Sequence, residues 1–229
     1  MNTYPATFEL PTTDGLTGLL VAPYFRHLLR EELLPQVSES NEPLSLFLLD
    51  TDELLTVNSV HGRESGDRVL ADVAGVLRAV MPQSAVLTRY GGDEFGGALP
   101  GTRLDDAFSL LEEIRRRVAD LVFEGLPDLH MTCSVGLAAY PTHGEHEAVL
   151  VRAADEALYT AKASGRNKVA LPLTDSRMVT KTSHYTSTQL ERLAQLAKAL
   201  GRNEASVLRE ALDDVLKKYN DRLGVPPEA

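Results

Sequence analysis

The 229-residue chain is predicted to be an α/β (α+β) protein, in which helices pack on a mostly antiparallel sheet and a small helical module follows. Helical and strand-like apolar patterns alternate over residues 16–170, which is typical of a layered α/β domain. Proline and turn-forming residues then interrupt the pattern at 171–176, and two amphipathic helical stripes come after them. The length suits one full domain and a smaller second one.

Composition and charge narrow the class of protein. With 43% apolar and 24% charged residues, the chain has an ordinary soluble composition, and no run reaches the roughly 20 apolar residues of a membrane span. The amino end lacks a secretory signal, so we expect a cytoplasmic protein with no membrane segment. Residues 1–175 carry 14 Lys and Arg against 26 Asp and Glu, whereas residues 176–229 carry 9 against 7. The large domain should therefore repel nucleic acid, and the tail need not.

The most informative stretch is residues 89–95, which read RYGGDEF. Two glycines followed by two carboxylates lie between strand-like runs at 86–87 and 95–99, and paired glycines suit a tight hairpin. Glycines also let a phosphate approach the backbone, while Asp93 and Glu94 offer the oxygen ligands that Mg²⁺ prefers. Taken alone, the stretch fits either an ordinary hairpin turn or a metal-nucleotide site.

Further motifs flank this stretch in a fixed order. DGLTGL occupies residues 14–19, and the apolar run 44–49 predicts a core strand that ends in Asp50. Asn58 and then Gly66-Asp67 open a helical pattern, and ADEALY, AK and GRN follow between residues 154 and 167. Together these motifs resemble the GGDEF family of diguanylate cyclases over residues 14–170.

The resemblance implies a ferredoxin-like cyclase fold and the condensation of two GTP into cyclic di-GMP and pyrophosphate across a homodimer. Its cofactor would be Mg²⁺ or Mn²⁺, and its catalytic residues Asp93 and Glu94. The implied metal site consists of Asp50, Thr51, Asp93 and Glu94, with Thr51 contributing its carbonyl oxygen. The implied substrate-binding residues are Asn58, Asp67, Gly91, Gly92, Lys162 and Arg166. Asp67 suits guanine, because a carboxylate can accept from both N–H donors of that base.

Several positions depart from the family pattern. Leu54-Leu55 stands where the family usually has Phe-Lys, which removes a phosphate-binding cation. Arg63 replaces a usual histidine and is a candidate substitute for that cation. PQSA at 82–85 replaces the Arg-x-x-Asp of a product-inhibition site, so we predict no such feedback. Loss of the lysine also leaves open an alternative, a DNA-binding transcription regulator that responds to GTP or cyclic di-GMP without turnover.

Beyond residue 176 the sequence predicts two short helices. Leu190, Leu193, Leu196 and Leu200 form one apolar stripe, which ends at Gly201, a natural helix stop. A second stripe runs over residues 207–216 behind Asn203, a good helix cap. Two such helices cannot bury both stripes alone, so we expect the tail to pair with another copy.

With the extended stretch 179–186, these helices resemble the ribbon-helix-helix family of dimeric DNA-binding modules. The resemblance implies that double-stranded DNA would meet Thr180, Thr182, His184, Arg202 and Asn203. DNA binding and dimerisation alone remain two alternatives for the tail. The predicted organisation is a cyclase domain at 1–171, a linker at 172–176, a β-α-α dimerisation module at 177–220 and a flexible tail at 221–229.

Overall fold

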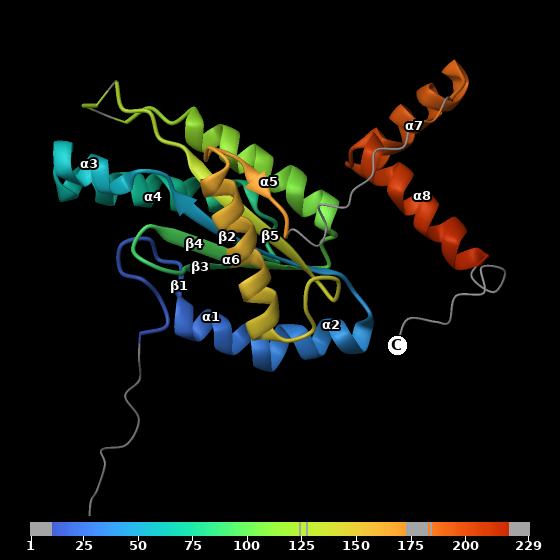
Figure 1. The fold of residues 1–229 in the computed structure, drawn as a ribbon, viewed down its shortest axis with the longest axis horizontal. Coiled ribbons are helices and arrows are strands. Elements are labelled where there is room, and N and C mark those ends of the chain that lie inside the picture. The colour runs from blue at the N-terminus through green and yellow to red at the C-terminus, as the bar shows by residue number, and fades with distance from the viewer. Residues whose placement is uncertain (1–10, 124, 127, 173–182, 184, 220–229) are drawn as a thin grey trace, which may run out of the picture. The chain divides into compact units, whose positions relative to one another are not determined.

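The computed structural model describes residues 11–123, 125–126, 128–172, 183 and 185–219 (Figure 1). The chain forms two compact units, residues 1–178 and 179–229, and each is described by itself. The predicted linker beyond residue 172 and the predicted tail at 221–229 lie outside the described residues and remain predictions.

The first unit is built on one six-stranded sheet with the strand order β1-β3-β4-β2-β5-β6. The central strand β2 is antiparallel to both β4 and β5, and β3 is antiparallel to β4. The two short edge strands, β1 and β6, run parallel to their neighbours. The predicted mostly antiparallel sheet is therefore confirmed. The strands are β1 (Leu20–Val21), β2 (Leu44–Thr51), β3 (Val86–Arg89), β4 (Glu94–Pro100), β5 (Cys133–Tyr140) and β6 (Val169–Ala170).

Helices cover both faces of this sheet (Figure 1). One face carries α1 (Ala22–Leu28), a π-helical turn η1 (Leu29–Leu33), α2 (Leu34–Ser40) and α6 (Glu147–Ala163). The other face carries α3 (Leu54–His61), α4 (Arg63–Val80) and α5 (Leu104–Ala119). Among the helices that the structure describes, none combines the length and apolar character that a membrane span requires.

The central strand explains how the two cores are separated. All eight residues of β2 are buried, and its middle, Leu46–Leu49, is a continuous apolar run rather than an alternating one. Side chains still alternate in direction: Leu46 and Leu48 join the core beneath α1 and α6, whereas Phe47 and Leu49 join the core beneath α4 and α5. The same alternation turns Asp50 towards the α6 face.

The second unit contains the two predicted helices, α7 (Ser187–Leu200) and α8 (Glu204–Lys218). Thr186 and Gln189 form a capping box at the start of α7, and Gly201 ends it with a φ of 66°. The Asn203 side chain accepts a hydrogen bond of 2.7 Å from the Ser206 N–H. The predicted helix stop at Gly201 and cap at Asn203 are thus confirmed.

Few apolar side chains of this unit are buried. Within its described residues, Ala197 and Val207 are the buried hydrophobic side chains. Those exposed by two fifths or more are Tyr185, Leu190, Leu196, Leu200, Leu212, Val215 and Tyr219. The predicted strand residues Thr180, Thr182 and His184 lie outside the described residues.

Candidate active site

Asp50 ends the central strand beside the closing helix α6. Its side chain is largely buried, and its Oδ2 lies 2.6 Å from the Nζ of Lys162. Burial raises the pKa of Asp50; the hydrogen bond and charge of Lys162 oppose this rise, while Asp93 and Asp52 add to it. Lys162 is therefore the counter-charge that offsets the burial of this carboxylate.

Glu94 lies directly opposite Asp50 on the neighbouring strand β4. In the adjacent turn the Thr51 N–H donates to the Asp93 carbonyl oxygen at 3.0 Å, so the end of β2 and the hairpin are joined. Burial raises the pKa of Glu94, Lys162 lowers it, and Asp50, Asp93 and Asp155 raise it further. Negative charge accumulates at this edge of the sheet and favours a bound cation.

The glycine turn is held by its own backbone and by Arg89. The N–H groups of Tyr90 and Gly91 both donate to the Glu94 carbonyl oxygen, at 2.7 and 3.0 Å. Arg89 Nη2 donates to the Gly92 carbonyl oxygen at 2.6 Å, and its Nη1 pairs with the Asp14 carboxylate at 3.1 Å. Arg89 thus connects the hairpin to the DGLTGL motif.

Asp14 is itself fixed in place by the same motif. Its Oδ1 accepts hydrogen bonds from the Thr17 N–H at 2.8 Å and from the Thr17 hydroxyl at 2.7 Å. Burial alone would raise the pKa of Asp14, but the bonds from Thr17 and the charge of Arg89 lower it overall. Sequence reasoning identified this motif but not its task, which is to fasten the hairpin that carries Asp93.

A cavity of about 420 Å³ lies between α3, α4 and the hairpin. It brings together four predicted site residues, Asn58, Asp67, Gly92 and Asp93. Gly66 allows this arrangement, because a Cβ there would lie 2.0 Å from the Asn58 Oδ1. The full lining is Leu54, Leu55, Asn58, Arg63, Asp67, Leu70, Arg89, Gly92 and Asp93.

Comparison with known proteins assigns the family. Residues 11–168 match the family model described as "Diguanylate cyclase, GGDEF domain". The chain belongs to the GGDEF family. The matched range ends before the second unit.

Relatives of this GGDEF chain include Diguanylate cyclase A of Treponema denticola, 34% identical over 71% of this chain and 45% of that protein. The response regulator PleD of Caulobacter vibrioides is 36% identical over 73% of this chain and 37% of its own length. The GGDEF chain thus spans less than half of either relative. Among solved structures, the GGDEF domain of DgcB from Caulobacter crescentus, in complex with c-di-GMP, superposes with a TM-score of 0.66 at 30% identity. That match covers 74% of this chain and 98% of the other and confirms the predicted cyclase fold, but not the predicted ribbon-helix-helix module.

Two charged residues of the GGDEF unit lie apart from the cavity with Asp93. Asp52 is buried and accepts hydrogen bonds from Thr132 Oγ1 at 2.6 Å and Ser134 Oγ at 2.7 Å, so it serves the loop structure. Arg166 follows α6 with a φ of 59° and lines a different cavity of about 390 Å³. The structure therefore brings Lys162 to the acidic edge of the sheet, whereas Arg166 lines a separate cavity.

The donor set suits a hard divalent cation. Among the described residues, no three His, Cys, Asp or Glu side chains form a ready-made metal cluster. Mg²⁺ does not need one, since it is usually held by one or two carboxylates together with water and substrate phosphates. Asp50, Asp93 and the Thr51 carbonyl at the sheet edge fit that requirement.

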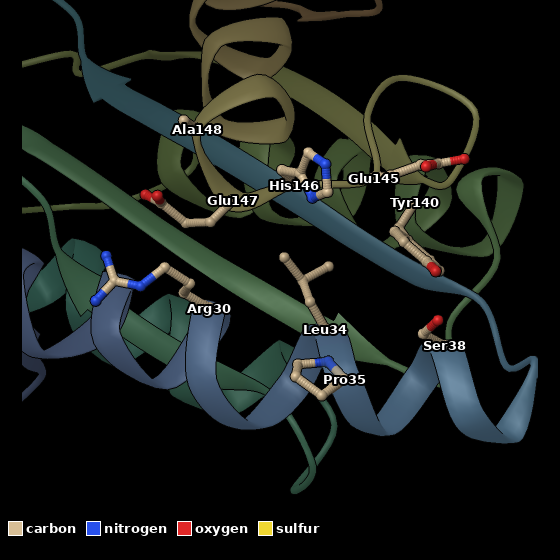
Figure 2. A pocket seen from close by; sticks show the side chains of 9 residues that line it. All are labelled: Arg30, Leu34, Pro35, Ser38, Tyr140, Glu145, His146, Glu147 and Ala148. Carbon is tan, nitrogen blue, oxygen red and sulfur yellow. The ribbon is translucent and has the colours of Figure 1, made fainter.

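Another cavity, of about 490 Å³, lies between α2 and the start of α6 (Figure 2). Arg30 and Glu147 lie at one end and Ser38 and Tyr140 at the other. Glu147 is buried and forms an ion pair with Arg26. No residue of the GGDEF hairpin lines this cavity, so it is not the candidate active site.

Proposed function

We propose that this chain is a diguanylate cyclase that condenses two GTP molecules into cyclic di-GMP and releases pyrophosphate. One observation supports this above all. A single cavity joins Asn58 and Asp67 to Gly92 and Asp93, next to the acidic edge of the sheet at Asp50. A nucleoside triphosphate needs a region that binds its base next to a region that binds its phosphates and metal, and this cavity offers both.

In this proposal Asn58 and Asp67 bind the guanine base. The Asp67 carboxylate accepts hydrogen bonds from the N1–H and the exocyclic amino group of guanine. Adenine offers no matching pair of donors on that edge, so it would leave a polar group unpaired and bind more weakly.

The phosphates would lie over Gly91 and Gly92, and at Gly92 a Cβ would meet nothing within 4 Å, so the backbone there is open to close approach. Lys162 would donate to a phosphate oxygen, exchanging part of its contact with Asp50. Asp50, Asp93, Glu94 and the Thr51 carbonyl would hold Mg²⁺ or Mn²⁺, which neutralises phosphate charge when bound. Arg166 lines a different cavity, so joining them would require its exposed side chain to reorient.

The reaction needs two half-sites, because the 3′-OH of one GTP attacks the α-phosphate of the other. Catalysis then rests on alignment and electrostatics, with each protomer orienting one nucleotide. The exposed apolar side chains of α7 and α8 support a homodimer formed through the second unit. A short tether would give the two cyclase domains an effective concentration on the order of millimolar.

Whether that second unit also contacts DNA is a separate part of the proposal. Arg202 ion-pairs with Glu210 and donates to the Ser206 hydroxyl at 2.6 Å, and Asn203 caps α8. These contacts stabilise the turn between the helices and favour dimerisation alone over phosphate binding by Arg202 and Asn203. A salt-dependent mobility shift of double-stranded DNA would support the ribbon-helix-helix role instead.

A second candidate function is a nucleotide-responsive regulator without turnover. The observation that favours it is Leu55, which is 78% exposed beside the cavity where a cation would strengthen phosphate binding. Such a protein would bind GTP or cyclic di-GMP and form no product.

The deciding experiment incubates the full-length protein with GTP and Mg²⁺ and measures cyclic di-GMP by mass spectrometry. We expect product from the wild type and none from Asp93→Ala or Glu94→Ala. Bound GTP without product would favour the regulator. Deleting residues 176–229 should lower specific activity at low protein concentration, and unchanged activity would contradict the proposed role of the tail.

A further inference from the structure

We infer that Arg63 contacts the acceptor edge of the guanine base, formed by O6 and N7, and so adds to the base specificity of the site. The inference rests on the proposed function, in which GTP occupies the cavity beside the GGDEF hairpin. Arg63 is the first residue of α4, and its side chain lines that cavity together with Asn58 and Asp67.

The position of Arg63 follows from the pairing of α3 with α4. The two helices are joined by the single residue Gly62, which has a φ of 83°. Gly66 packs against Asn58 across the pair, and Leu54 and Leu70 both line the cavity further from the turn. The helices therefore run antiparallel, with Arg63 at the closed end of the pair.

In the proposed binding mode, the phosphates lie near Asp93, at the end of the cavity away from Arg63. Leu54 follows the end of β2 closely, and the Thr51 N–H binds the Asp93 carbonyl there. Seven residues separate Arg63 from Leu70 on α4, a rise of about 10 Å. A nucleotide with its base between Asn58 and Asp67 and its phosphates near Asp93 would present the base, not the phosphates, to Arg63. In this arrangement Arg63 would read the base rather than take the place of a lysine at position 55.

The chemistry of the base fits this placement. An ionised carboxylate only accepts hydrogen bonds, so Asp67 can serve the N–H donors of guanine but not its O6 and N7. The forked guanidinium of an arginine matches those two acceptors, and this pairing is the commonest specific base contact in protein–DNA complexes. Arg63 lies one helical turn before Asp67, on the same face of α4. Neither side chain has an ion-pair partner within the described part of the chain, so both are available to a ligand.

The test compares GDP with 7-deaza-GDP, in which a C–H replaces N7, and with guanosine. GDP has no pyrophosphate to release, so equilibrium binding to the full-length protein can be measured by calorimetry with Mg²⁺ present. We expect the wild type to bind GDP about tenfold more tightly than 7-deaza-GDP. Arg63→Ala should bind both equally, and its loss of affinity should be the same for guanosine as for GDP.

Two further variants sharpen the result. Arg63→Lys keeps the charge but not the fork, so it should also lose the preference for N7. Arg68→Ala removes an exposed arginine of α4 that does not line the cavity, and it should keep the wild-type preference.

Two outcomes would overturn the inference while leaving the proposed function intact. One is an Arg63→Ala variant that still prefers GDP over 7-deaza-GDP. The other is an Arg63→Ala variant that loses affinity for GDP but not for guanosine, since that result would mean a phosphate contact. A wild type that binds no guanine compound and makes no cyclic di-GMP would instead overturn the proposed function, and the inference with it.

Discussion

Gly66 provides a sharp test of the proposed base-binding site, because it lies inside α4 against Asn58. An alanine Cβ at this position would lie 2.0 Å from the Asn58 Oδ1 and 2.9 Å from its Cγ, whereas ordinary contacts begin at 3.4 Å. Since the obstacle is a side chain, Gly66→Ala should displace the Asn58 amide by more than about 1 Å rather than unfold the helix. That shift exceeds the tolerance of a hydrogen bond.

The two consequences of the substitution have opposite signs. One neutral hydrogen bond contributes about 0.5 to 1.5 kcal/mol, so losing it should weaken GTP binding by roughly twofold to tenfold. Replacing a helical glycine by alanine stabilises the helix by about 0.5 to 1 kcal/mol. We therefore expect Gly66→Ala to bind GTP less tightly without a fall in melting temperature.

Gly75→Ala is the matched control. Gly75 lies in the same helix, and a Cβ there meets nothing within 4 Å. It should gain the same helical stability, measured by thermal unfolding, and keep the wild-type affinity for GTP, measured by calorimetry without divalent metal so that no turnover occurs. If Gly66→Ala binds GTP as tightly as Gly75→Ala does, the proposed role of Asn58 is refuted.

Three other predictions concern the core and the acidic edge. Burial raises the pKa of Glu94, so its ionised form costs stability above the ordinary value of 4.5. In metal-free buffer at pH 7.5, Glu94→Gln should melt at a higher temperature than the wild type. This difference in melting temperature should disappear in acid, where the wild-type carboxyl is protonated. A difference that does not change with pH would contradict the idea that the buried charge of Glu94 causes it. A Cβ at Gly136 would lie 2.0 Å from the Ala154 carbonyl oxygen and 2.3 Å from the Leu158 amide, so Gly136→Ala should lose about 3 kcal/mol in urea unfolding. An unchanged midpoint would refute this close packing. Burial also raises the pKa of the Cys133 thiol, so a thiol reagent should label it only after unfolding, and rapid labelling of the native protein would be the contrary result.

Much of the fold followed from the sequence alone because its signals are local. A continuous apolar run predicted the buried central strand β2, and paired glycines between two strand patterns predicted the hairpin between β3 and β4. Gly201 and Asn203 marked where α7 ends and α8 begins. Such features depend only on a residue and its near neighbours in the chain, so they can be predicted from the sequence.

The sequence also supplied the members of the candidate site, because the GGDEF motifs keep their order along the chain. It could not supply their partners. The pairing of Arg89 with Asp14 joins residues 75 positions apart, and Lys162 meets Asp50 only because α6 lies across the end of β2. The spacing of the motifs along the chain does not predict either contact.

Tertiary structure alone decided where the remaining charged residues lie. Arg166 was expected to bind the phosphates together with Lys162, yet in the structure it follows α6 and lines a separate cavity. Arg63 was a candidate substitute for the lysine absent at Leu55, and the pairing of α3 with α4 places it in the same cavity as Asn58, Asp67 and Asp93, which motif spacing does not show. The identity of a residue is local, but the direction of its side chain depends on strand register and helix docking, which arise from the packing of the whole unit.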